Sequence, residues 1–576
     1  MYGFLLQLHI RPAFFPCFKK KILPYDAPLR SIYMNSRPSV SGGVQEGGRP
    51  TLLNKRTFFY QAALLALSNT VLLLLGFVYR VMLGRLAGAE GLGVYTLTIQ
   101  VYAIVMSVCV AGLCVGVTHV SASLAARSDI LGIRRLVRFA MFCFIALLGI
   151  MAVPIVLMRN QIASGILGDA RTANALWMIL ICILLTGTEN ILKATFHGTR
   201  MVRFTAISEL GEQVLRILLA SLLLARFING DHGHTAFLIL SVMTLSELYS
   251  VVFLGASYFV KFRIPAQSKK KPAAGIRRSF LKIAVPSALT SMLSNVFASI
   301  SVVIFPSRLM LSGYTRAEAV SSLGLISGMV MPVLLLPSAL VGALCTLIMP
   351  SIAASISRGD HPDLIRKVNK GIEAAGLLGL PATAVLLPYI PMLCGLLFGQ
   401  TVPPALADAL SLQAITMYYL AISTSILNGI GKQKQVLILA AVGEALQLAL
   451  VWVLTAVPRL HVYGYIIGML SGDLLRVAAG FILLHKATHT RPRLFHAGVV
   501  PIACSVILYV SVRMIFFSAL QHGMTAVGAM LVSMPVCTLL YFLLLRLLGV
   551  RIWPYFRKIV FRKDPAHPNG PEAEAV

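Results

Sequence analysis

The chain of 576 residues is 57% hydrophobic and only 12% charged, with a mean hydropathy of +0.83 and a net charge of +30. This composition is typical of a polytopic membrane protein and excludes an ordinary soluble enzyme. The basic residues stand between hydrophobic runs, so we interpret them as topology signals and as contacts with anionic membrane lipids. We therefore expect no nucleic-acid partner.

Residues 1–56 precede the first long apolar run. Phe4–Ile10 is too short to span a bilayer, and no small-residue cleavage site follows it, so the segment is a poor signal peptide. Residues 37–56 are rich in Gly, Ser and Pro, and we expect a disordered cytosolic extension there. Both Met1 and Met34 stay open as the start of translation.

Fourteen apolar stretches are each long enough to cross a hydrocarbon core of roughly 30 Å as a helix. They lie at residues 57–83, 92–117, 135–158, 173–195, 204–228, 235–260, 280–308, 319–347, 369–398, 405–429, 436–457, 462–485, 496–517 and 524–548. With both termini in the cytosol, most of the 50 lysines and arginines fall in inner segments, as the positive-inside rule requires. The sequence thus predicts an all-α protein with about 14 transmembrane helices.

The chain contains an internal repeat with an offset of about 231 residues. The small-residue exit of the second helix, residues 117–129, resembles residues 348–360, and residues 206–213 resemble residues 437–447. Each copy holds six helices, an even number, so the repeat is parallel and its pseudo-two-fold axis lies along the membrane normal. The predicted domains are an N-lobe (57–260), a basic cytosolic linker (261–279), a C-lobe (280–485), two further helices (486–548) and a basic cytosolic tail (549–576).

The most distinctive stretch joins the first two helices. It reads Gly76-Phe-Val-Tyr-Arg80, then Gly84-Arg85-Leu-Ala-Gly88-Ala-Glu-Gly-Leu-Gly93, and we expect it to form a short hairpin outside the hydrocarbon. This pattern resembles the stage V sporulation protein B branch of bacterial oligosaccharide flippases, within the multidrug/oligosaccharidyl-lipid/polysaccharide (MOP) exporter superfamily. The resemblance covers nearly the whole chain from about residue 55.

The resemblance implies a central cavity between two six-helix lobes, lined mainly by helices 1, 2, 7 and 8. It also implies a monomeric flippase in the bacterial cytoplasmic membrane that moves an undecaprenyl-linked saccharide to the outer leaflet by alternating access, with glycosyltransferases or polymerases as partners. Lipid II flippases of the superfamily carry arginines on helix 2, and here none lies between Leu92 and Val117. The lipid II mechanism is therefore not carried over directly.

A lipid-linked pyrophosphate needs cationic donors, and arginine offers a bidentate fork. Arg80 and Arg85 lie near the outer end of helix 1, and Arg308 lies near the outer end of helix 7. We predict that these three form an anion clamp on two walls of the cavity. The alternative is that their side chains snorkel to the outer headgroups.

Charged residues inside the spans need an explanation because they are costly in a bilayer. Glu212 and Arg216 are four residues apart on helix 5, and a similar pair, Asp473 and Arg476, lies on helix 12. Glu444 occupies the repeat position of Glu212, whereas Glu247 has no partner on its own helix. These six residues are predicted either to hold helices together as ion pairs or to couple transport to a cation gradient, with Glu247 as the best single candidate for coupling.

Prolines should bend the helices that line the predicted cavity. They are Pro286 and Pro306 in helix 7, and Pro332 and Pro337 in helix 8, and we predict hinges at these positions. The nine cysteines show no metal-ligand spacing and no nucleotide-binding motif occurs, so we expect no metal, no cofactor and no ATPase activity.

Three other functions remain open from the sequence. A cation-coupled small-molecule or multidrug exporter of the same fold is the main alternative. A membrane glycosyltransferase is disfavoured because the predicted outer loops are short and hold few carboxylates, so we expect no enzymatic activity. A non-transporting scaffold is the third. The sequence leaves open the glycan, the energy source, a role in sporulation and the oligomeric state.

Overall fold

The structure is a computed structural model that describes residues 55–228, 230–263, 275–488 and 498–547, with side chains from residue 68 onward. Every described side chain belongs to the compact unit Phe59–Val576. Nearly all of the predicted N-terminal extension, most of the predicted linker and the whole predicted tail (549–576) lie outside the described residues.

The described part of the chain is helical and contains no strand. Its α-helices are α2 (Lys55–Met106), α3 (Gly112–Ala126), α4 (Ile130–Leu157), α5 (Arg159–Gln161), α6 (Ala173–Gly198), α7 (Val202–Leu219), α8 (Ala225–Phe227), α9 (His232–Lys261), α10 (Ile276–Leu311), α11 (Arg316–Leu323), α12 (Met331–Leu334), α13 (Ser338–Ser357), α14 (His361–Leu386), α15 (Ile390–Phe398), α16 (Pro404–Gly429), α17 (Gln433–Leu454), α18 (Val462–Thr488), α19 (Val500–Gln521) and α20 (Ala526–Leu547). The π-helical segments are η1 (Ser107–Ala111), η2 (Ile162–Ile166), η4 (Ala220–Leu224) and η5 (Gly324–Val330), and the 3-10 segments are η3 (Ala170–Thr172) and η6 (Leu387–Tyr389).

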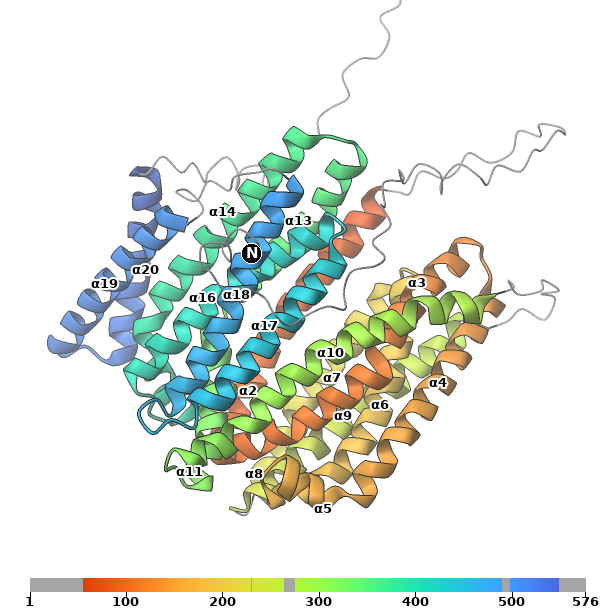
Figure 1. Cartoon of the computed structure of the whole chain (residues 1–576), viewed down its shortest axis with the longest axis horizontal. Helices are drawn as coiled ribbons and strands as arrows, with labels where there is room; N and C mark the ends of the chain where they lie inside the picture. Colours follow the sequence, from red (N-terminus) through yellow and green to blue (C-terminus); the bar gives the residue numbers. More distant parts are fainter. Residues whose placement is uncertain (1–54, 229, 264–274, 489–497, 548–576) are drawn as a thin grey trace, which may run out of the picture. The chain divides into compact units, whose positions relative to one another are not determined.

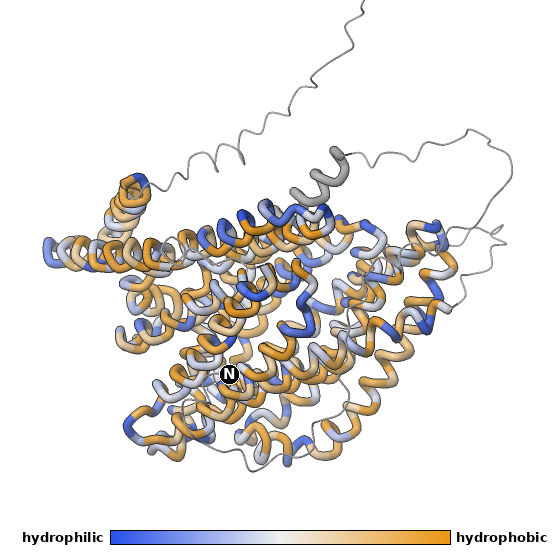
Figure 2. Tube along the Cα trace, turned by 45° about the horizontal axis from the view of Figure 1, so that its top comes forward, coloured by the Kyte–Doolittle hydropathy of each residue, from blue (hydrophilic) through white to orange (hydrophobic). Residues whose placement is uncertain are grey.

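Thirteen of the described helical stretches are long and apolar enough to cross a membrane. Ser68–Ala126 is a single stretch that covers most of the first predicted helix and all of the second, and the predicted eighth helix is two stretches that break at Leu335–Pro337. The predicted fifth helix, α7, is not among the thirteen. Each of the fourteen predicted spans is helical over most of its described residues, so the prediction of an all-α protein with about 14 spans is confirmed. Hydrophobic residues run along most of each helix, as Figure 2 shows.

Gly88 separates the first two spans. Its backbone angles, φ 67° and ψ 178°, lie in a region that only glycine adopts readily. The residues on both sides, including Arg85 and Glu90, are helical. The predicted hairpin is therefore shorter than expected, because one glycine makes the break and no loop is needed.

Short polar side chains fix where several helices begin. The side chain of Asp129 accepts a hydrogen bond from the backbone N–H of Gly132 at the start of α4, and Asp231 does the same for Gly233 at the start of α9. Thr315 and Glu318 form a reciprocal capping box at the start of α11. These caps satisfy backbone donors that have no partner within the helix.

The two halves share one pattern of helix packing. In the first half α6 packs against α3, α4 and α9, and α7 packs against α9. In the second half α16 packs against α13, α14 and α18, and α17 packs against α18. The order of the elements in the chain is also the same. α19 and α20 lie outside this pattern and pack on α14, as Figure 1 shows in dark blue at one edge.

One close contact between the two halves is a pair of glycines, Gly93 and Gly324, which are 231 residues apart, the offset of the sequence repeat. A Cβ atom added to Gly93 would lie 2.0 Å from the carbonyl oxygen of Val320, and one added to Gly324 would lie 1.8 Å from that of Ala89. Ala89 and Val320 are also repeat equivalents. The contact is therefore self-complementary about the pseudo-two-fold axis.

We predict that Gly324→Ala destabilises the protein by roughly 1–3 kcal/mol, because overpacking a close backbone contact forces one helix away from the other. Gly149→Ala on α4 is the matched control, since a Cβ there would meet nothing within 4 Å. Thermal unfolding of the purified proteins in detergent measures the difference. Equal midpoints for the two variants would contradict the close crossing.

Candidate functional site: a cationic cavity and two buried charge networks

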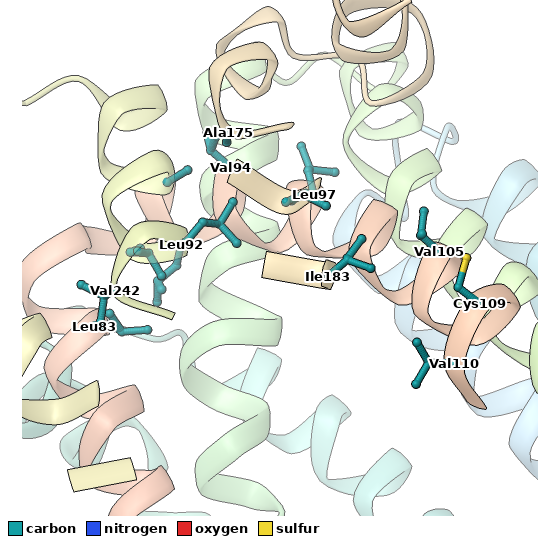
Figure 3. Packing of buried hydrophobic residues seen from close by; sticks show 14 of the residues in the cluster. Leu83, Leu92, Val94, Leu97, Val105, Cys109, Val110, Ala175, Ile183 and Val242 are labelled. Carbon is teal, nitrogen blue, oxygen red and sulfur yellow. The ribbon is translucent and has the colours of Figure 1, made fainter. Parts of the chain in front are cut away.

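A hydrophobic cluster holds α2, α6 and α9 together around the site. Figure 3 shows Leu83, Leu92, Leu97, Ile183 and Val242 among its members, and all are buried. Leu83 and Leu92 stand on either side of the break at Gly88 and also line the neighbouring cavity. The position of the cavity is thus fixed by core packing rather than by a loop.

The cavity has a volume of about 420 Å³ and is lined by α2, α7, α9 and η5. Its polar lining residues are Tyr79, Arg80, Tyr95, Thr96, Gln213, Arg216 and Ser327. No carboxylate is among the lining residues, whereas two guanidinium groups are. Hydroxyl, amide and guanidinium donors in one cavity suit an anionic, oxygen-rich ligand.

Of the three predicted clamp residues, only Arg80 lines this cavity. Arg85 instead donates from Nε to the carbonyl oxygen of Leu397 and from a terminal nitrogen to that of Leu396, both at 2.6 Å. These are carbonyl groups of the last turn of α15, where a cation is favourable. Arg85 therefore ties the first half of the chain to the second.

Arg308 is held by a single residue of α17. Its Nε donates to the carbonyl oxygen of Trp452 at 2.8 Å, and its guanidinium lies 4.3 Å from the centre of the Trp452 ring. The structure does not bring Arg308 or Arg85 into the cavity with Arg80. Arg216 supplies the second guanidinium group of the cavity. Its position in the middle of an apolar stretch was the signal from which a cavity-lining role could have been predicted.

The predicted pair of Glu212 and Arg216 is present, and it belongs to a larger network. Arg216 also lies 3.2 Å from Oε1 of Glu247 on α9 and donates from Nε to the hydroxyl of Ser246 at 2.9 Å. On the other side, Lys193 of α6 contacts Glu189 at 2.6 Å and Glu209 at 3.3 Å. The sequence reasoning missed that Glu189, Glu212 and Glu247 come together.

A smaller network occupies the second half. Arg476 of α18 contacts Glu444 of α17 at 2.5 Å and also pairs with Asp473 on its own helix. Glu444 and Asp473 are buried. In both halves an arginine bridges two carboxylates between the fifth and sixth helices of the repeat, but it comes from the fifth helix in the first half and from the sixth in the second.

The four prolines of the predicted hinges have different surroundings. Pro286 and Pro306 lie inside α10, which continues as one helix from Ile276 to Leu311. Pro332 lies in the first turn of α12, and Pro337 precedes α13 directly, so these two bound the break in the eighth span. Bending at these positions during transport stays a prediction.

A charged cluster also surrounds the break at Gly88. Arg171 contacts Glu90 at 2.6 Å and Asp169 at 2.7 Å, and His232 lies 3.2 Å from Glu90. Although burial opposes ionisation of Asp169, hydrogen bonds from Arg171 hold the pKa of Asp169 below its usual value. This cluster ties the second, fourth and sixth helices of the first half together.

No family model matches the chain. A solved structure of a multidrug resistance MATE family transporter of the MOP superfamily, in an inward-facing conformation, covers 73% of this chain and 94% of its own length, with 18% identity and a TM-score of 0.58. A MOP superfamily transporter from Pyrococcus furiosus covers 75% of this chain and 97% of its own, with 18% identity and a TM-score of 0.52. The fold is therefore that of MOP superfamily transporters.

Within that fold, the chain is similar to particular bacterial proteins. Stage V sporulation protein B of Bacillus subtilis (strain 168) is 22% identical over 449 residues, which are 75% of this chain and 84% of the relative. The lipid II flippase MurJ of the same strain is 21% identical over 541 residues, 86% and 97% of the two chains. The resemblance to a stage V sporulation protein B-like member of the MOP superfamily is thus confirmed. The relative that is named for an activity is a flippase, in agreement with a multi-pass bacterial membrane protein that is not an enzyme.

We predict that Arg476→Leu lowers the free energy of unfolding by roughly 3–5 kcal/mol, because it leaves the carboxylates of Glu444 and Asp473 buried without their cation. The matched control is Arg513→Leu on α19, which changes an exposed arginine of another transmembrane helix. Chemical unfolding of both purified variants compares the two losses. A loss in Arg476→Leu no larger than in the control would show that this network contributes little to stability.

Proposed function

We propose that the protein is a flippase that moves an undecaprenyl-linked oligosaccharide, a cell-wall or polysaccharide precursor, from the inner to the outer leaflet by alternating access. The observation that carries this proposal is the cavity beside Arg80 and Arg216, which holds two guanidinium groups and no lining carboxylate. The likeness to a lipid II flippase over most of both chains supports it.

The chemistry of the cavity fits the head of such a lipid better than it fits a cationic drug. A pyrophosphate and a glycan carry many oxygen acceptors, and the lining supplies guanidinium, amide and hydroxyl donors. A polar head needs such groups to replace water on its way through the hydrocarbon. A cation-coupled exporter of cationic molecules, the alternative, would need acidic residues in the lining of this cavity.

In the orientation we propose, both termini are cytosolic and Gly88 faces outward. Arg80 then lies about 12 Å from the outer turn, at 1.5 Å of rise for each of the helical residues that separate it from Gly88. The crossing of Gly93 and Gly324 is the outer closure, and its separation opens the cavity to the outer leaflet. The protein acts as a monomer, with anionic lipids at its basic inner segments and glycan-synthesising enzymes as partners.

We predict that Arg80→Ala lowers translocation roughly ten- to hundredfold without loss of expression, because one charge-assisted hydrogen bond contributes about 1.5–3 kcal/mol. The measurement is reconstitution of the full chain in liposomes with fluorescent undecaprenyl-linked saccharides, with accessibility on the far leaflet as the readout. Arg80→Lys keeps the charge but not the fork, and we expect an intermediate rate. A wild-type rate in Arg80→Ala would remove the anion site.

Arg308→Ala tests the wider clamp in the same assay. Because the guanidinium of Arg308 is held by Trp452, we expect a smaller loss than in Arg80→Ala. A loss equal to that of Arg80→Ala would mean that Arg308 leaves Trp452 and joins the substrate site on the second wall. Arg513→Ala is the control for a general effect of removing an arginine from a transmembrane helix.

A further inference from the structure

Three buried carboxylates of the first half converge from three different helices. They are Glu189 on α6, Glu212 on α7 and Glu247 on α9, with 1%, 7% and 3% of their surfaces exposed. One carboxylate oxygen from each lies within 4.8 Å of the other two. Charges of one sign so close together in the interior repel strongly unless positive charge lies between them.

The described cations around this cluster carry one positive charge fewer than the three carboxylates carry negative charges. Among the described residues, Lys193 and Arg216 are the cations that contact the three buried carboxylates. Glu209 adds a fourth carboxylate beside Lys193, but its side chain is 30% exposed and can keep part of its hydration. An unbalanced negative charge inside a transmembrane helix bundle is costly, so one further positive charge would stabilise the cluster.

The hydrogen bonds show where that charge belongs. Both oxygens of Glu212 have donors, since one is paired with Arg216 and the other accepts from the hydroxyl of Ser250 at 2.9 Å. Oε1 of Glu247 faces Arg216, but its Oε2 is buried and accepts no hydrogen bond from any described residue. A carboxylate oxygen of Glu189 lies within 4.8 Å of one of Glu247.

A proton suits this position better than a metal ion. A hard cation takes about six or more oxygen ligands, and here the ammonium of Lys193 and the guanidinium of Arg216 already occupy the sides of the cluster. A proton needs one lone pair from each of two facing carboxylates, which cannot both be ionised at such close range. We propose that Glu189 and Glu247 share one proton, and that Arg216 couples this proton to the anion in the cavity.

The coupling follows from the two positions that Arg216 occupies at once. Its guanidinium is paired with Glu212 and Glu247, and the same residue lines the cavity next to Gln213. An anion in the cavity competes with the carboxylates for this guanidinium. When Arg216 turns toward the anion, the acid cluster loses positive charge and holds its proton more tightly, and protonation in turn frees Arg216.

This coupling rests on the proposed function, whereas the shared proton does not. Proton and anionic substrate then bind together, so that the proton offsets part of the anion's charge inside the transmembrane bundle. The other titratable groups near the pair are Tyr79, Tyr95, Tyr102, Cys182, Lys193, Glu209 and Glu212. Of these, Lys193, Glu209 and Glu212 carry the charges that affect how tightly the pair holds its proton.

The shared proton is tested by infrared spectroscopy of the full chain in liposomes. We expect a carboxylic acid C=O band near neutral pH that shifts in D₂O, is lost in both Glu247→Gln and Glu189→Gln, and is kept in Glu373→Gln on α14. Thermal unfolding checks that each variant is folded. If Glu247→Gln does not fold, Glu247→Asp takes its place, and we expect Glu247→Asp to retain the band because it keeps a carboxyl group. Absence of the band in the wild type, or its appearance only without sodium, would overturn the proton site.

The coupling is tested by calorimetry with inorganic pyrophosphate as the probe, in buffers of different ionisation enthalpy. At a pH high enough for the wild type to have lost the infrared band, we expect the wild type to take up protons as pyrophosphate binds, and Glu247→Gln to bind pyrophosphate without proton uptake. Equal uptake in the two proteins would overturn the coupling. An infrared band with no pyrophosphate binding would overturn the anion site of the proposed function and leave the proton site standing, so the two failures can be told apart.

Discussion

The close crossing of two helices at Gly93 and Gly324 is the constraint on which the rest of the structure depends. No side chain fits between the backbones there, because even a Cβ atom would lie about 2 Å from a carbonyl oxygen. Leu92 and Gly328 belong to the same crossing and also form a wall of the cavity. This contact between the two halves thus also closes the space in which a ligand would bind.

The repeat supplies the scaffold, and differences between its copies supply the chemistry. Both halves pack their helices in the same order. Yet the repeat position of Arg80 is Leu311, and both guanidinium groups of the cavity come from the first half. The bridging arginine also changes helix, from the fifth in the first half (Arg216) to the sixth in the second (Arg476). Only the first of these two arginines reaches the cavity.

The spans and their number could be predicted because bilayer thickness and helical rise fix the length of each apolar run. The repeat could be predicted because similar residue patterns recur at one offset. The directions of the charged side chains could not, since they depend on groups far away in the chain. Arg85 ends on carbonyl groups of α15 and Arg308 on Trp452, neither of which any local pattern indicates. The contact of Glu189 with Glu247 joins α6 to α9 and was equally hidden. The pair of Glu212 and Arg216 was predictable because it is local, four residues apart on one helix.

The polarity of α7 bears on how the protein enters the membrane during synthesis. Val202–Leu219 carries Glu209, Glu212 and Arg216 and is not among the helices apolar enough to cross alone. Each charge at the centre of a lone helix costs about 2.5–3.5 kcal/mol on insertion scales. Lys193 arrives before α7 and Glu247 arrives after it, on neighbouring spans. The nascent chain must therefore hold α7 at the translocon until α9 has emerged, and the three helices partition into lipid as one unit.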